Sequence, residues 1–172
     1  MSTNRRNFLK TGVTAALGLS GFSLISPKVL GKSMGYVAPS DQVNLACIGI
    51  GNRGAEIIKA LHKTGLCTIV ALCDVDMGAK QTLEVMEIFP KAKKYQDFRK
   101  MFDEIGGEFD AVSIATPDFS HFPVTMMALA EGKHVYVEKP MARTFQEVDL
   151  MMAAAKKSPK LATQMGNQGH SE

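Results

Sequence analysis

A short, mostly apolar run that ends in three spaced glycines constrains the fold of this chain most. Residues 43–48 form the run, and Gly49, Gly51 and Gly54 follow at G-x-G-x-x-G spacing before an amphipathic segment. This order predicts a strand, a sharp turn and a helix. In such a unit Gly49 permits the turn, Gly51 lets backbone approach a pyrophosphate, and Gly54 lets the helix pack closely on the strand. The helix N-terminus then offers unpaired N–H groups to the anion.

The residues between these glycines complete the candidate anion-binding loop. They are Ile50, Asn52 and Arg53. Glycines at this spacing occur in many loops, so the pattern depends on its context: a strand before it, a helix after it and an acid downstream. All three are predicted here, with Asp74 standing 25 positions after Gly49. The context therefore favours a dinucleotide-binding turn.

Segments with strand and helix patterns alternate along the chain. The expected strands cover residues 43–48, 67–73, 92–95, 111–115, 134–137 and 161–165. The expected helices cover residues 52–63, 77–89 and 122–131, with a short one opened by Asp97 and a last one opened by a Thr144–Glu147 capping box. In the last helix, the residues expected to face inward are Val148, Met151, Met152 and Ala155. This alternation predicts an α/β fold, a Rossmann-like doubly wound parallel sheet with helices on both faces.

Four groups of chemically suggestive residues follow the ends of predicted strands. They are the glycine turn, Asp74, residues 116–121 and residues 138–140. In open α/β sheets, ligands bind beyond the carboxyl ends of the strands. We therefore expect these groups to converge along one edge of the sheet and to form a groove.

The acid after the second predicted strand bears on the choice of cofactor. A carboxylate at Asp74 can accept both hydroxyls of an adenosine ribose and would repel a 2′-phosphate, which favours NAD over NADP. Asp76 competes for this role. Arg53 leaves the choice open, because its side chain can pair with a 2′-phosphate or lie over the pyrophosphate. We predict NAD as the cofactor, with NADP less favoured.

The segment after residues 111–115 offers further candidates. Thr116 and Pro117 should line the groove, where the Thr116 hydroxyl can donate to a ribose or phosphate, although Pro117 and Asp118 are also ordinary turn formers. His121 stands at the start of the next helix. We weigh a contact of His121 with the nicotinamide or the substrate against simple solvation.

Glu138-Lys139-Pro140 is the most specific motif after the glycines. Together with the glycine turn, Asp74 and Thr116-Pro117, in this order and spacing, it resembles the Gfo/Idh/MocA oxidoreductases from residue 42 onward. The resemblance implies a nicotinamide-dependent dehydrogenase that acts on sugars, cyclitols or related polyols. It also implies that Lys139 is catalytic, because an ammonium there can stabilise the alkoxide that develops as hydride leaves. Glu138 would contact the nicotinamide ribose or orient Lys139.

The same resemblance leaves two other functions open. One is an NAD-dependent glycosidase of the same superfamily, although we expect E-V-P there, and Lys139 weighs against it. The other is a non-catalytic dinucleotide-binding module. Family members are about twice as long, with a second α/β domain that forms the substrate pocket and the contact between subunits. Residues 166–172 are interpreted as the start of that domain, so we expect this chain alone to be inactive and the full-length parent to be a homo-oligomer.

The first 33 residues are interpreted as a leader rather than as part of the fold. Residues 4–10, N-R-R-N-F-L-K, resemble a twin-arginine export signal, although Asn4 stands where serine or threonine is usual. This predicts export to the periplasm with the twin-arginine machinery as a partner, and a permanent membrane anchor is the alternative. Residues 34–42 are a predicted linker, and residues 43–165 are the predicted NAD(P)-binding domain.

Charge and cysteine content exclude two classes of site. The formal net charge is +3, but residues 1–33 hold five basic residues and no acid, so the rest of the chain carries −2. We therefore expect no basic face for nucleic acid. The cysteines, Cys47, Cys67 and Cys73, are odd in number and match no spacing of metal ligands, so they are interpreted as small core residues and no metal is predicted.

Overall fold

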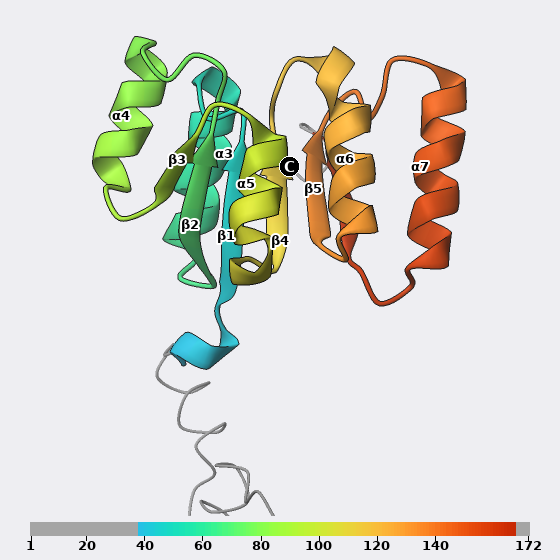
Figure 1. Cartoon of the computed structure of the whole chain (residues 1–172), viewed down its shortest axis with the longest axis horizontal. Helices are drawn as coiled ribbons and strands as arrows, with labels where there is room; N and C mark the ends of the chain where they lie inside the picture. The colour runs from blue at the N-terminus through green and yellow to red at the C-terminus, as the bar shows by residue number, and fades with distance from the viewer. Residues whose placement is uncertain (1–37, 168–172) are drawn as a thin grey trace, which may run out of the picture. The chain divides into compact units, whose positions relative to one another are not determined.

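Six parallel strands form the sheet of the described part of the chain, residues 38–167 of a computed structural model. The strands are β1 (Val43–Ile48), β2 (Cys67–Cys73), β3 (Lys93–Tyr95), β4 (Ala111–Ile114), β5 (His134–Glu138) and β6 (Thr163–Gly166). Their order across the sheet is β3-β2-β1-β4-β5-β6, and Figure 1 shows most of this order from left to right. The predicted fold class, a doubly wound parallel sheet, is confirmed.

The strand order reverses between β1 and β4. The chain starts at β1 in the centre, moves outward through β2 and β3, and then returns to β4 on the other side of β1. Connections that leave in opposite directions open a crevice at the carboxyl ends of the two central strands. The glycine turn after β1 and the turn after β4 therefore meet at this crevice.

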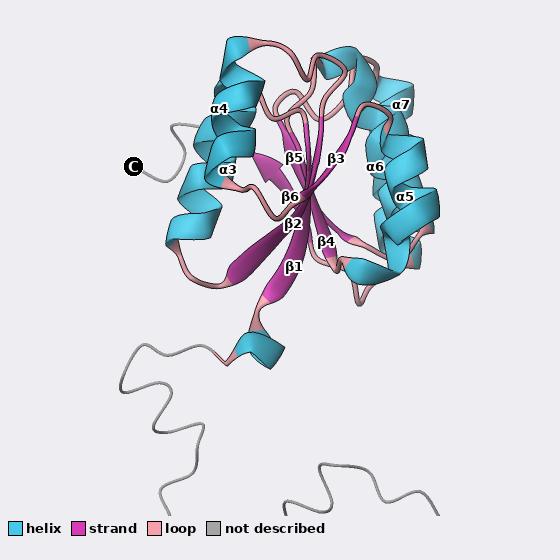
Figure 2. Ribbon diagram, turned by 60° about the vertical axis from the view of Figure 1, so that its left-hand side comes forward, coloured by secondary structure: helices cyan, strands magenta, loops and turns pink. Residues whose placement is uncertain are grey.

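Helices cover both faces of the sheet. Figure 2 shows α3 (Asn52–Lys63) and α4 (Lys80–Ile88) on one face, and α5 (Phe98–Ile105), α6 (His121–Ala130) and α7 (Phe145–Lys157) on the other. Each face has its own apolar cluster, one beneath α3 and α4 and a larger one beneath α5, α6 and α7. Three single 3-10 turns join these elements, η2 (Pro39–Asp41), η3 (Gly106–Glu108) and η4 (Asp118–Ser120).

Side chains fix where two of these helices begin. The Asp97 carboxylate accepts the backbone N–H of Arg99 at the start of α5. At α7, the Thr144 hydroxyl accepts the N–H of Glu147, and the Glu147 carboxylate accepts the N–H of Thr144, which is the predicted capping box. These bonds satisfy N–H groups that the helix itself leaves unpaired.

Helix α4 starts later than its sequence pattern predicts. It begins at Lys80 instead of residue 77. The Asp74 carboxylate accepts the N–H of Asp76, and the Asp76 carboxylate accepts the N–H of Gly78. Two successive turns of this kind occupy backbone groups that a helix would need. Residues 74–79 therefore form a loop that reaches over the end of the sheet.

The predicted inward face of α7 is wrong at one position. Met151 is buried, and Val148 and Ala155 are partly buried on the same stripe, but Met152 is 48% exposed. Neighbouring residues on a helix point about 100° apart, so a stripe that contains Met151 turns Met152 toward its margin. Met151 is the buried residue of α7, and its partly buried neighbours on the stripe add to the contact of the helix with the core.

The leader and the first part of the linker, residues 1–37, lie outside the described residues, as do residues 168–172. Of the predicted linker, residues 38–42 are described, and they include the turn η2. Among the residues that the structure describes, we find no helix with the length and apolar character to cross a membrane.

Candidate functional site

A groove of about 580 Å³ runs along the carboxyl ends of β1, β2 and β4. Most of the predicted site residues from these three strands line it: Gly49, Gly51, Asn52, Arg53, Asp74, Thr116 and Pro117. Ile50 and Gly54 instead support the groove from behind. The predicted convergence of separate segments along one edge is therefore present for this part of the site.

The glycine turn is packed so tightly that side chains are excluded at two positions. Gly49 has φ +78°, and a Cβ there would lie 2.6 Å from the carbonyl carbon of Ala115. A Cβ on Gly54 would overlap the carbonyl oxygen of Gly49. The side chain of Ile50 is fully buried and fixes the loop to the core. The loop is thus held against β4 on one side and against α3 on the other.

The N-terminus of α3 faces the groove without a capping side chain. Its N-cap residue is Gly51, and within residues 38–167 no side-chain cap bonds the first N–H groups of the helix. Asn52, at the first helical position, has φ 41°. An uncapped helix N-terminus carries a positive partial charge and backbone donors, which together bind a pyrophosphate.

The Asp74 carboxylate links the end of β2 to the glycine turn. One oxygen accepts the N–H of Ile50 at 2.9 Å, and the other accepts the N–H of Asp76 at 3.1 Å. A carboxylate has about four lone-pair positions, so each oxygen can still accept a ribose hydroxyl. Asp76 also lines the groove and stays a competitor for that role.

The hydroxyl of Thr116 lies in the wall of the groove without a hydrogen-bond partner. Its oxygen is buried, and no group among residues 38–167 bonds to it. A buried polar atom left unpaired costs about 1–3 kcal/mol. A ribose or phosphate oxygen could accept this hydroxyl only after the Thr116 side chain turns toward the groove, because the oxygen is shielded from solvent.

An ion pair joins the glycine turn to the E-K-P segment. The Glu138 carboxylate, at the end of β5, is 3.5 Å from Nε of Arg53, and the Glu138 residue is only 4% exposed. The Tyr136 hydroxyl donates to the same carboxylate at 3.4 Å. Arg53 also contacts Glu56 at 2.8 Å. The hydrogen bond to Glu56, and then the charge of Glu138, raise the pKa of the Arg53 guanidinium.

Lys139 follows Glu138 on the exposed side of the turn. It is not part of the groove lining, and no salt bridge among the described residues engages its ammonium. Its neighbour Glu138 contacts Arg53, which lines the groove, so Lys139 belongs to the segment that adjoins the glycine turn.

His121 does not face the groove, nor is it solvated. It is 1% exposed, and its ring nitrogens lie 2.6 Å from the carbonyl oxygen of Pro140 and 2.8 Å from that of Thr116. Both interpretations of His121 from the sequence, a contact with nicotinamide or substrate and simple solvation, are therefore wrong for its side chain. The ring instead spans the turns that follow β4 and β5.

The family of the chain is decided by comparison with known proteins. The family model GFO_IDH_MocA, described as an oxidoreductase family with an NAD-binding Rossmann fold, matches residues 43–166. The chain belongs to this family. The predicted resemblance is confirmed, and residues 43–166 are the NAD-binding Rossmann domain of a Gfo/Idh/MocA oxidoreductase.

Relatives and solved structures extend this likeness. A "Glycosyl hydrolase family 109 protein" of Shewanella pealeana is 30% identical over 97% of this chain and 40% of its own length. The crystal structure of myo-inositol 2-dehydrogenase from Lactobacillus plantarum matches with a TM-score of 0.65 and 27% identity, over 73% of this chain and 36% of that chain. An oxidoreductase from Agrobacterium radiobacter, in complex with NAD⁺, L-tartaric acid and magnesium, matches with a TM-score of 0.64 and 26% identity, over 72% and 35%. This Gfo/Idh/MocA chain thus spans 40% or less of each of these proteins.

One residue that sequence reasoning missed in this Gfo/Idh/MocA domain is Tyr136. Successive side chains of a strand alternate between faces, so Tyr136 and Glu138 share a face of β5. Burial, and then the charge of Glu138, raise the pKa of the Tyr136 phenol, so it stays protonated as a donor. Gly166 of β6 pairs with Glu138, and a Cβ there would lie 2.5 Å from both the Glu138 carboxylate and the Tyr136 hydroxyl. The alternation along β5 was the available signal.

The cysteines of the Gfo/Idh/MocA domain are poor nucleophiles and metal ligands. Burial raises the pKa of the Cys47 thiol, and burial followed by the charge of Asp74 raises that of Cys73 to about 12. Cys73 lines the groove, but as a protonated thiol it is inert near neutral pH. Within residues 38–167, no group of three or more candidate ligands is arranged to hold a metal ion.

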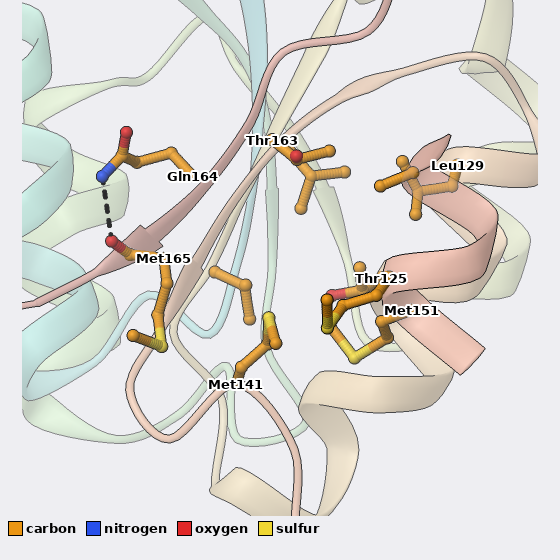
Figure 3. A pocket seen from close by; sticks show the side chains of 11 residues that line it. Thr125, Leu129, Met141, Met151, Thr163, Gln164 and Met165 are labelled. Atoms are coloured by element: carbon orange, nitrogen blue, oxygen red, sulfur yellow. Dashed lines mark hydrogen bonds between the residues drawn. The ribbon is translucent and has the colours of Figure 1, made fainter. Parts of the chain in front are cut away.

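A second, smaller cavity of about 130 Å³ lies among α6, α7, β5 and β6 (Figure 3). Four methionines, Met141, Met151, Met152 and Met165, are among the residues that line it. The side chain of Gln164 instead bonds the carbonyl oxygen of Met165. The lining contains no charged residue, so this cavity offers no group for acid–base or redox chemistry.

Proposed function

We propose that this chain is the NAD-binding domain of a dehydrogenase that moves a hydride between a sugar- or cyclitol-like hydroxyl and NAD. The contact between Arg53 and Glu138 carries the proposal. It brings the glycine turn, where a pyrophosphate would bind, beside the segment that carries Lys139. A dinucleotide lying along the groove would then present its nicotinamide end to Lys139.

Different residues along the groove would contact different parts of the dinucleotide. The N-terminus of α3 holds the pyrophosphate, Asp74 accepts the hydroxyls of the adenosine ribose, and the Thr116 hydroxyl donates to a ribose or phosphate oxygen. NAD supplies the acceptor for the hydride. Lys139 would donate a hydrogen bond to the substrate oxygen and stabilise its negative charge as the hydroxyl proton passes to a general base of the full-length protein. The hydride would then leave the carbon for NAD, and the oxygen would become a carbonyl.

The direction of the Arg53 side chain supports NAD rather than NADP. Its guanidinium lies against Glu56 and Glu138, toward β5. Asp74 stands at the end of β2, on the opposite side of β1 in the sheet. Arg53 is therefore turned away from the place where a 2′-phosphate would lie, and Asp74 would repel that phosphate. Tighter binding of NADP than of NAD would overturn this assignment.

Substitution of Lys139 tests the proposed reaction. In the full-length protein, Lys139→Ala should abolish oxidation of polyols by NAD, because the alkoxide loses its charge partner. The affinity for NADH, measured by titration of its fluorescence, should stay within about twofold, because the glycine turn is untouched. Lys63→Ala, at the far end of α3, is the matched surface control and should change neither quantity. An active Lys139→Ala enzyme would contradict the proposed role.

The second candidate function is an NAD-dependent glycosidase. It is favoured by the names of the curated relatives, which are glycosyl hydrolase family 109 proteins. Lys139 weighs against it, since the resemblance implies E-V-P in that branch. Incubation of the full-length protein with aryl glycosides separates the two functions. Release of the aryl group without net formation of NADH would favour the glycosidase, and binding of NAD without either reaction would favour a non-catalytic module.

We also propose that residues 1–33 direct the protein through the twin-arginine pathway. The arginine pair, Arg5 and Arg6, supports this proposal. A reporter fused to residues 1–40 should reach the periplasm, and replacement of both arginines by lysine should retain it in the cytoplasm. Export of the substituted fusion would refute the proposal, and recovery of the intact fusion in membranes would favour an anchor.

A further inference from the structure

The imidazole of His121 bridges two turns of the chain that are far apart in sequence. It comes from the first residue of α6, a helix fixed on the sheet by buried residues that include Val124 and Ala128. One ring nitrogen, Nε2, lies 2.8 Å from the carbonyl oxygen of Thr116, in the turn after β4. The other, Nδ1, lies 2.6 Å from the carbonyl oxygen of Pro140, in the turn after β5. The two turns carry different parts of the candidate site.

The turn after β5 has few other attachments. Residues 139–142 lie outside every helix and strand. Apart from the sheet ladder, the bond from His121 to Pro140 is the hydrogen bond that the described residues provide to this segment. Lys139 and Pro140 are exposed, whereas Met141 and Ala142 pack against the apolar cluster beneath α5, α6 and α7. The His121 ring therefore supplies the hydrogen bond that fixes the exposed Lys139–Pro140 part of the turn.

The two contacts of the His121 ring differ in which ring nitrogen is the hydrogen-bond donor. Both partners are carbonyl oxygens, which only accept, and a neutral imidazole carries a single N–H, so the ring donates to one of the two carbonyls in any one tautomer. The shorter distance, 2.6 Å to Pro140, indicates Nδ1–H as the primary donor. The ring is 1% exposed, so its nitrogens have these carbonyl oxygens, and not water, as partners.

We propose that His121 is a positioning residue that holds the Lys139–Pro140 turn against the nicotinamide end of the groove. This inference rests on the proposed function, because it assumes that a nicotinamide lies beside Lys139. His121 itself touches neither cofactor nor substrate. It acts through the Pro140 carbonyl, so its loss releases the turn while the α3 N-terminus and Asp74 keep their geometry.

Two substitutions separate the ends of the bridge. The amide nitrogen of asparagine falls near the place of Nδ1, and that of glutamine near the place of Nε2. His121→Asn therefore keeps a donor for Pro140, whereas His121→Gln keeps a donor for Thr116. The ligands are NADH, which has a nicotinamide, and ADP-ribose, which lacks one. His62→Gln, an exposed histidine of α3, is the control and should change neither affinity.

The expected result is specific to one variant and one ligand. His121→Gln should weaken NADH binding about tenfold, the effect of losing one buried hydrogen bond, while ADP-ribose binding stays within about twofold. The emission of bound NADH should shift toward that of the free molecule. His121→Asn should bind NADH within about threefold of the unaltered chain.

Other outcomes overturn the inference. Equal losses of affinity for both ligands would mean that His121 only stabilises the fold. Unchanged NADH binding in His121→Gln would mean that the hydrogen bond to Pro140 is not needed to position the turn. If the unaltered chain binds neither ligand, the proposed function fails first. Should both variants fail to fold, NMR of the unaltered chain decides: the Nδ1 proton should exchange slowly with solvent, and rapid exchange would refute its bond to Pro140.

Discussion

Replacing Gly49 by alanine tests the close packing of the glycine turn on the turn after β4. Gly49 has φ +78°, a conformation that costs a residue with a Cβ about 1–2 kcal/mol. The new Cβ would lie 2.6 Å from the carbonyl carbon of Ala115 and from the amide nitrogen of Thr116. These are backbone atoms that cannot rotate away, and overpacking costs about a further 1–3 kcal/mol. Gly49→Ala should therefore lower the free energy of unfolding by about 2–5 kcal/mol.

Two other glycines isolate the packing contribution. Gly65 and Gly132 have φ +69° and +70°, but a Cβ at either meets no atom within 4 Å. Gly65→Ala and Gly132→Ala should thus cost only the conformational part, about 1–2 kcal/mol. Unfolding in urea, followed by circular dichroism, gives the three free energies, with the same slope expected for all variants. If Gly49→Ala costs no more than Gly65→Ala, the turns after β1 and β4 do not pack as described.

Three further predictions concern Asp74, α7 and Cys73. Asp74→Asn should lower the free energy of unfolding by about 1–3 kcal/mol and weaken NAD binding, because the amide cannot accept from both backbone N–H groups. Urea denaturation measures the change in stability, and titration with NAD measures the change in affinity. Unchanged stability would contradict the two hydrogen bonds. In urea unfolding, Met151→Ala should lower the free energy of unfolding by about 2–5 kcal/mol, and Met152→Gln should lower it by less than about 0.5 kcal/mol. Equal losses for the two variants would contradict the observed buried face of α7. The pKa of Cys73 rises from 9.0 to about 12 on folding, so the native chain keeps a proton that the unfolded chain loses. Its contribution to stability is complete below pH 9 and is lost between pH 9 and about 12, and Cys73→Ala should show a shallower alkaline loss than the unaltered chain.

The first quarter of the domain, residues 43–73, was predictable because its signals are local. The bounds of β1, α3 and β2 agree with the ranges read from the sequence, residues 43–48, 52–63 and 67–73. Glycines and continuous apolar runs mark these boundaries without help from distant residues. The capping box of α7 was predictable for the same reason.

Prediction failed where a side chain competes for backbone groups. The helical pattern of residues 77–89 holds only from Lys80, because Asp74 and Asp76 bond the N–H groups of the preceding loop. A periodic pattern shows which residues favour a helix, but it does not show which aspartate will accept which N–H. This loop forms part of the groove, so the error falls at the site itself.

The links between segments could not be predicted, because they depend on the order of the strands. Arg53 meets Glu138, and His121 reaches Pro140, only because β5 lies beside β4 and β4 beside β1. Alternation of strands and helices predicts a parallel sheet but leaves many orders open. The sequence therefore placed candidate residues at strand ends, and tertiary structure decided that His121 is a bridge and not a ligand.

Two carboxylates flank the glycine turn, yet the groove is suited to an anion. Asp74 on one side already accepts two backbone N–H groups, and Glu138 on the other side lies against Arg53 and the Tyr136 hydroxyl. Each negative charge thus meets donors within the protein, and the positive end of α3 is left for the pyrophosphate. A second phosphate on the adenosine ribose would meet the charge of Asp74, while the Arg53 guanidinium contacts Glu56 and Glu138 and so lies toward β5. The preference for NAD that we propose therefore follows from the same ion pair that joins the cofactor groove to the E-K-P segment.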